Sequence, residues 1–180
     1  MKVLLHGCCG PCASYPAPFL LDEGYDLHAC FYNPNIHPFT EYEKRKQGFY
    51  ELTQHYNLPV IGEEDYDPTP YLQAVAFRET QRCRLCHQIR LERTAQIARK
   101  GKFEAFTTSL LVSPYQKHDL IKEIGLNCAE KYGVPFLYFD WRPHYSETVK
   151  KSQELGLYRQ PYCGCLYSEW ERYRKKNKKE

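Results

Sequence analysis

The chain has 180 residues, of which 42% are hydrophobic and 26% are charged. This composition is typical of one folded domain with a sizeable core, and it excludes a disordered or fibrous protein. The apolar runs are short, as at Leu110 to Val112, whereas a membrane span needs about 20 apolar residues. The N-terminal apolar stretch is also shorter than the roughly seven to fifteen residues of a signal peptide. We therefore expect a cytoplasmic protein with no membrane partner.

Apolar runs alternate with longer segments of helical character along the chain. The expected strands are Val3 to Leu5, Leu27 to Tyr32, Pro59 to Ile61, Phe103 to Thr107 and Phe136 to Phe139. The expected helices are Tyr42 to Tyr56, Leu85 to Ala98, Gln116 to Lys131, Glu147 to Leu155 and Tyr162 to Arg174. This alternation predicts a single α/β domain over residues 1–180, with a mostly parallel sheet of about five strands flanked by helices.

The basic residues gather at the C-terminus. The net charge is +3, but residues 171–180 carry six basic and two acidic side chains, so the preceding residues are slightly acidic. We expect a basic C-terminal helix and tail at about residues 166–180. A terminal run of this kind suits contacts with nucleic-acid phosphates, and a solvated helix end is the alternative interpretation.

Several polar and cysteine-containing loops follow the expected strands. In open parallel sheets, the functional site lies beyond the carboxyl ends of the strands, at the point where the strand order reverses. A strand order of 3-2-1-4-5 would make the CCGPC loop after the first strand face the loop around Ser113 to Gln116 after the fourth. The loop Asn33 to Pro38 and the loop Asp140 to Pro143 would open on the same side. A metal site is therefore expected at these carboxyl ends.

Seven of the nine cysteines fall into three close groups. These groups are CCGPC with Cys8, Cys9 and Cys12, CRLC with Cys83 and Cys86, and CGC with Cys163 and Cys165. Grouped cysteines without a secretory signal indicate metal binding or redox chemistry rather than structural disulfides. An iron–sulfur cluster, a structural zinc site and thiol redox chemistry are the three interpretations that the spacing leaves open.

Three residues outside the cysteine groups are further candidates. Asp140 follows the fifth expected strand, where its carboxylate would be an iron ligand, a proton donor or an ordinary helix cap. His6 ends the first strand, where it is either a core side chain or a proton donor beside the cysteines. Tyr115 lies in the loop that faces CCGPC and could stack on a nucleobase.

Four motifs, HGCCGPC, RCRLCHQIRLERTA, TTSLLVSPYQ and GLYRQPYCGCLYSE, follow one another over nearly the whole chain. With them the sequence closely resembles the epoxyqueuosine reductases of the QueH type. The family's first motif usually has alanine where this chain has Gly10, and its second usually has tyrosine where His87 stands. The resemblance implies a fold similar to the adenine nucleotide alpha hydrolases (HUP-like).

The resemblance implies the last step of queuosine biosynthesis, in which the epoxide of epoxyqueuosine at the wobble position of a tRNA with a GUN anticodon is reduced by two electrons without cobalamin. It implies a [4Fe-4S] cluster on Cys8, Cys9, Cys83 and Cys86, with Cys163 and Cys165 as a redox-active pair that forms a disulfide or binds metal. A second, mononuclear iron is the further hypothesis, with Cys12, Cys163, Cys165 and Asp140 as its ligands and as the catalytic residues. The electron donor is not identified by the sequence.

For the tRNA, we expect Tyr115 and Gln116 to contact the anticodon-loop base in the pocket. The phosphates would be held by the basic side chains near the C-terminus: Arg172, Arg174, Lys175, Lys176, Lys178 and Lys179. The sequence also resembles ATP-dependent tRNA-modifying enzymes in its strand and helix order, but HGCCGPC lacks their SGGxDS phosphate loop. The non-enzymatic alternative is a zinc-stapled RNA-binding module.

Overall fold

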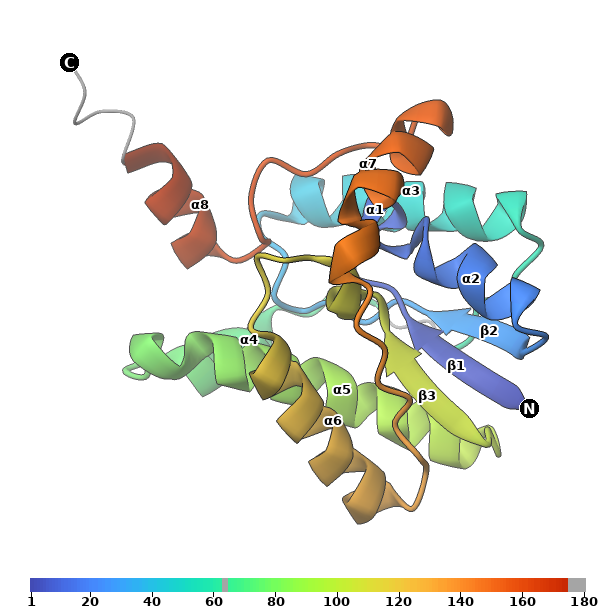
Figure 1. The fold of residues 1–180 in the computed structure, drawn as a ribbon. Coiled ribbons are helices and arrows are strands. Elements are labelled where there is room, and N and C mark those ends of the chain that lie inside the picture. The colour runs from blue at the N-terminus through green and yellow to red at the C-terminus, as the bar shows by residue number, and fades with distance from the viewer. Residues whose placement is uncertain (63–64, 175–180) are drawn as a thin grey trace.

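The computed structural model describes residues 1–62 and 65–174. Its centre is a parallel sheet of β1 (Lys2–His6), β2 (Asp26–Cys30) and β3 (Ala105–Thr108), in the order β2-β1-β3 (Figure 1). In β1, Val3, Leu4 and Leu5 are fully buried, as expected of a central strand that is covered by helices on both faces. The α/β class with a parallel sheet is therefore confirmed.

Helices lie on both faces of this sheet. Along the chain they are α1 (Gly10–Ala13), α2 (Pro16–Asp22), α3 (Phe39–His55), α4 (Thr69–Val75), α5 (Arg82–Lys100), α6 (His118–Tyr132), α7 (Tyr145–Glu154) and α8 (Leu166–Arg174). Three short 3-10 helices join them: η1 (Glu79–Gln81), η2 (Ser109–Val112) and η3 (Arg142–His144). Helices α5 and α6 cover one face, while α1, α2, α3 and α7 lie on the other (Figure 1). None of the described helices has the length and apolar character needed to cross a membrane.

The sheet has three strands rather than the expected five. The two outer segments each touch the sheet through a single parallel bridge, Val60 beside Ala29 in β2 and Phe136 beside Phe106 in β3. Pro59 and Pro135 precede these bridges and have no N–H with which to extend the ladder. Counting these two segments at the edges, the spatial order is the predicted one. The expected last helix begins at Leu166 instead of Tyr162, and the short helices α1, α2 and α4 were not predicted.

Gly10 permits a close approach between α1 and α3. A Cβ atom built on Gly10 would lie 2.2 Å from the backbone oxygen of Gly48, a distance that no real contact has. The obstacle is backbone in the middle of a 17-residue helix, so it cannot move aside as a side chain could. Because Gly10 directly follows Cys9, this contact also fixes the position of the first cysteine group against α3.

We therefore expect Gly10→Ala to lower the free energy of unfolding by about 1–3 kcal/mol, the usual cost of overpacking. Gly48→Ala is the matched control, since a Cβ atom there would meet Tyr158 at an ordinary 3.8 Å. Alanine at position 48 should leave stability unchanged or raise it by up to about 1 kcal/mol, because alanine favours the helix. Urea unfolding of both variants measures the difference, and equal stabilities would contradict this close approach.

Candidate metal centre

A cavity of about 900 Å³ opens at the carboxyl ends of the strands. It is bordered by the loops after β1, β2 and β3 and by the segment before α8, including Cys8, Cys12, Arg90, Gln116, Tyr145 and Cys163. Hydrogen bonds fasten these loops to one another. The backbone N–H of Cys8 donates to Ser109 Oγ at 3.0 Å, and Asn33 Nδ2 donates to the backbone oxygen of Gly7 at 2.9 Å. The predicted meeting of the loops after the first, second and fourth expected strands is thus observed.

The first cysteine group forms a compact triad on this cavity. The sulfur atoms of Cys8, Cys9 and Cys12 all lie within 4.8 Å of one another, and Cys8 Sγ is 3.9 Å from Cys9 Sγ. Cys9 is the N-cap of α1, and its sulfur accepts the backbone N–H of Cys12 at 3.4 Å. The short turn through Gly10 and Pro11 therefore turns all three side chains toward one point, where they could hold a metal.

The three thiols of the triad differ in acidity. Hydrogen bonds from Cys12 and Cys9 hold the pKa of Cys8 well below its usual value, and Arg90 and Ser109 act in the same direction. The pKa of Cys12 is raised because its thiol forms hydrogen bonds with Cys8 and Cys9. The pKa of Cys9 is raised by burial. A bound metal ion would replace the protons that these three hydrogen-bonded thiols share.

The other two cysteine groups lie close to each other. Cys86, near the beginning of α5, packs in one buried cluster with Cys165 and Tyr71. Burial raises the pKa of the Cys86 thiol to about 12. Among the described residues, Cys12 rather than Cys83 or Cys86 joins Cys8 and Cys9 within 4.8 Å. The ligand set that the resemblance implies, Cys8 and Cys9 with Cys83 and Cys86, stays a prediction.

Arg45 holds the CGC segment over the cavity. This buried side chain on α3 forms an ion pair with Glu41 at 2.7 Å and donates to the backbone oxygens of Tyr162 at 2.9 Å and Cys163 at 2.8 Å. The backbone N–H of His37 donates to the oxygen of Gly164 at 2.8 Å. Three hydrogen bonds from the β2–α3 region thus fix a segment that is more than a hundred residues away in the sequence.

Gly164 is required between the two cysteines. Its φ of +148° belongs to a region that other residues rarely adopt, and an added Cβ would lie 3.2 Å from Asn35 Nδ2. The two cysteines on either side of this turn have different environments: Cys163 is exposed and lines the cavity, while Cys165 is buried. The segment therefore presents one thiol to the cavity and one to the protein interior.

Two glutamine amides contact cavity thiols. Gln116 Nε2 donates to Cys163 Sγ at 3.4 Å, and Gln160 Nε2 donates to Cys12 Sγ at 3.6 Å. Gln116 was a sequence candidate as a substrate contact, whereas Gln160 was missed. The only sequence signal for Gln160 is its place three residues before Cys163, which says nothing of its contact with Cys12.

The other sequence candidates have different surroundings. Asp140 is exposed and accepts a hydrogen bond from Arg142 Nε at 2.7 Å, and this pairing lowers its pKa to about 2. Asp140 is not one of the described residues that line the cavity, whereas Cys12 and Cys163 are. The structure therefore does not bring Asp140 to Cys12, Cys163 or Cys165. Tyr115 does line the cavity and is 82% exposed.

His6 is a buried core residue rather than a group that faces the cavity. Its Nδ1 lies 2.9 Å from Thr108 Oγ1 and its Nε2 lies 3.2 Å from the backbone oxygen of Tyr32. Burial, with Arg90 acting in the same direction, lowers its pKa to about 3. A neutral ring with both nitrogens engaged links the ends of β1 and β3, which favours the core interpretation of the two that the sequence left open.

Three comparisons relate this chain to known proteins. A family model described as epoxyqueuosine reductase QueH matches residues 3–171. The epoxyqueuosine reductase QueH of Dehalococcoides mccartyi is 39% identical over 176 residues, which cover 98% of this chain and 97% of the relative. That of Thermotoga maritima is 40% identical over 185 residues, covering 96% of this chain and 93% of the relative.

Among solved structures, a predicted subunit of tRNA methyltransferase from Methanocaldococcus jannaschii superposes with a TM-score of 0.55, over 86% of this chain and 75% of that one. At 15% identity, this likeness shows a shared fold alone. The family match and the relatives, by contrast, extend across all three cysteine groups. The chain therefore belongs to the epoxyqueuosine reductase QueH family.

Proposed function

We propose that this chain reduces the epoxide of epoxyqueuosine, in the anticodon loop of a tRNA, to the alkene of queuosine. The reaction consumes two electrons and two protons, and the epoxide oxygen leaves as water. The observation that carries the proposal is that cysteines of the first and third groups of the family-matched sequence line one cavity at the carboxyl ends of the strands, and that Cys86 of the second group packs against Cys165 of the third. The same convergence argues against the zinc-stapled module, which needs only one closed set of four ligands.

The first cysteine group has the spacing of thiolates on one metal ion, and the other two groups supply further thiols. Two thiolates on one tetrahedral ion with bonds of about 2.3 Å lie about 3.8 Å apart, and the Cys8 and Cys9 sulfurs are 3.9 Å apart. An iron–sulfur cluster needs about four thiolates, and the second and third groups contain four more cysteines. We infer that the seven cysteines hold a [4Fe-4S] cluster and a second iron, with Cys12 acting together with Cys8 and Cys9. When bound, this cofactor would supply the electrons of the reaction, which it receives from a separate donor.

The cavity can hold and orient a nucleoside. Its volume lies within the range of small-molecule sites, about 300–1,000 Å³. Burial raises the pKa of Tyr145, so its phenol keeps its hydrogen at neutral pH and can donate to the departing oxygen. The exposed ring of Tyr115 meets the Tyr145 ring edge to face, with centroids 5.7 Å apart, and leaves one side open for a base to stack.

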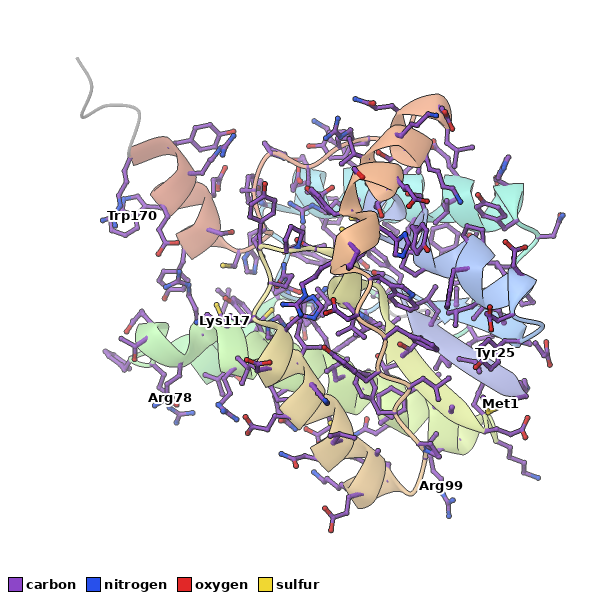
Figure 2. All side chains as sticks on the ribbon, viewed as in Figure 1. Met1, Tyr25, Arg78, Arg99, Lys117 and Trp170 are labelled. Atoms are coloured by element: carbon purple, nitrogen blue, oxygen red, sulfur yellow. The ribbon has the colours of Figure 1, made fainter. Side chains whose placement is uncertain are left out.

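Helix α8 supplies an RNA-facing wall of the cavity. It projects from the body of the molecule in Figure 1 and is tied to α5 by the ion pair of Glu171 with Arg82 at 2.6 Å. Trp170 is 57% exposed and lies on the opposite side of the view from Met1 in Figure 2. The Arg174 guanidinium lies 3.9 Å from the centre of its ring. Basic and aromatic side chains together suit single-stranded RNA, whose phosphates and bases they bind.

We expect the double variant Arg172→Gln, Arg174→Gln to bind tRNA more weakly and with a flatter salt dependence. Each lost phosphate contact should reduce the slope of log affinity against log salt by about 0.7 to 0.9. Titrations of tRNA at several salt concentrations measure this slope. Lys175, which we also predicted to bind phosphate, lies outside the described residues. Removing residues 174–180 should flatten the slope further.

The control for this variant is Lys100→Gln, which removes an exposed positive charge at the far end of α5 from the cavity. Its salt slope should equal that of the original chain. If the arginine variant and the lysine variant had the same slope, α8 would not be the phosphate-binding surface.

Metal analysis of the chain purified without oxygen tests the cofactor assignment. We expect about four irons and four sulfides per chain, one further iron, and a broad visible band that dithionite bleaches. Stoichiometric zinc without sulfide would instead favour the zinc-stapled RNA-binding module and overturn the redox proposal.

A further inference from the structure

Two arginines are almost completely buried, and they differ in what balances their charge. Arg45 and Arg90 are each 3% exposed. Arg45 pairs with the carboxylate of Glu41 at 2.7 Å. Within the part of the chain that the structure describes, Arg90 forms no ion pair with a carboxylate, and its Nε atom has no hydrogen-bond partner. Arg90 is thus a buried cation whose counter-charge is not a carboxylate.

The groups that face Arg90 are thiols. Its Nη1 atom donates to Cys86 Sγ at 3.6 Å. The other groups that can become anionic and that interact electrostatically with its guanidinium are Cys8 of the triad and Cys163 of the CGC segment. Arg90 lines the cavity together with Cys8 and Cys163, so one cation reaches all three cysteine groups.

Neutral thiols would not compensate this charge. Burying a cation without an anionic partner costs several kcal/mol, and a hydrogen bond to a weakly polar thiol offsets little of it. A centre of several metal-bound thiolates is anionic and would provide the missing charge. The histidines beside Arg90 cannot do so, because His6 and His87 are neutral or positive and never anionic.

We propose that Arg90 is the counter-cation of an anionic metal–thiolate centre in this cavity and that it sets the reduction potential of that centre. The inference rests on the proposed function only for the identity of the metal. Arg90 would act as a positioning residue: its charge favours the reduced centre, which is the more negative form, and so raises the potential. Its charge, rather than its shape, is what the role requires.

The first experiment compares the reduction potentials of three iron-loaded variants with that of the original chain, by dithionite titration of the visible band. Arg90→Met removes the charge and keeps most of the volume, Arg90→Lys keeps the charge, and Arg84→Met removes a half-exposed charge from the same helix. We expect a shift to more negative potential for Arg90→Met alone. Loss of iron from Arg90→Met with retention in Arg90→Lys would support the same role.

An unchanged potential in Arg90→Met, or equal shifts or equal iron loss in Arg90→Met and Arg90→Lys, would overturn the proposal. So would an unchanged potential combined with weaker tRNA binding, because Arg90 would then serve an RNA phosphate.

The second experiment needs no iron and separates this proposal from the proposed function. In the metal-free, reduced chain the low-pKa thiol of Cys8 is, among the described residues, the one group that can offset the charge of Arg90, and it offsets that charge only in part. Arg90→Met should therefore raise the urea midpoint of unfolding relative to Arg84→Met. A lower midpoint would mean that Arg90 is an ordinary structural residue and would overturn the proposal. A chain that binds no iron would instead contradict the proposed function, and this second comparison would still decide the role of Arg90.

Discussion

Arg45→Met is expected to lower the free energy of unfolding by about 3–5 kcal/mol, because it leaves the carboxylate of Glu41 buried without its partner. It should also abolish epoxide reduction. The guanidinium of Arg45 donates to the backbone oxygens of Tyr162 and Cys163, and without these bonds the CGC segment loses its position over the cavity. Urea unfolding and single-turnover activity measure the two effects.

A double variant separates stability from function. Glu41→Leu combined with Arg45→Met replaces the buried ion pair with apolar side chains of similar size, a change that is often neutral or stabilising. Tyr158, which donates to Glu41 at 2.5 Å, is only half-buried and can turn to water. We expect stability to return and activity to stay lost. Recovery of activity in the double variant would show that Arg45 matters for folding alone.

Cys86→Ala, like Cys83→Ala, is expected to remove cluster absorption and activity together, since each cysteine would supply a ligand. Cys8→Ala and Cys12→Ala should both lose the metal that the triad binds, because both sulfurs belong to the triad. The matched control is Cys128→Ala, which changes a buried core cysteine on α6 away from the cavity. It should keep both iron and activity.

Iron and sulfide content with the visible spectrum measures these outcomes. A colourless Cys86→Ala variant with full activity would contradict the redox role of the cluster. A Cys12→Ala variant that keeps all its iron while Cys8→Ala loses it would contradict the triad as one ligand set.

The sequence predicts the central strands because their apolar runs are long enough to form complete strands of the sheet. Val3 to Leu5 is buried on both faces, and the spatial order of the segments is the one expected of an open parallel sheet whose strand order reverses beside the first strand. The edges are less predictable. The runs at Pro59 and Phe136 have strand-like composition, but each is limited to one bridge by its neighbouring proline. Glycine at position 10 is required by the close contact with α3, and this contact cannot be predicted from the neighbouring residues in the sequence.

The candidate site is predictable in its residue types and less so in its groupings. Spacing alone indicates that Cys8, Cys9 and Cys12 share a turn, and the structure brings them together. The residues that hold the site are separated from it by long stretches of sequence, as Arg45 is from Cys163 and Gln160 from Cys12. No local pattern marks such contacts. Local sequence can also mislead: Asp140 follows an expected strand and was expected as an iron ligand, but its carboxylate pairs with Arg142.

The most direct test of the central claim is conversion of epoxyqueuosine in tRNA by the iron-loaded chain. The chain would be purified without oxygen and incubated with tRNA that carries epoxyqueuosine, with dithionite as electron source and without cobalamin. Nucleosides from the digested tRNA would then be analysed by mass spectrometry. The account predicts queuosine, lighter than the substrate by one oxygen, and none with Cys86→Ala. Unchanged epoxyqueuosine in the presence of fully iron-loaded chain would contradict it.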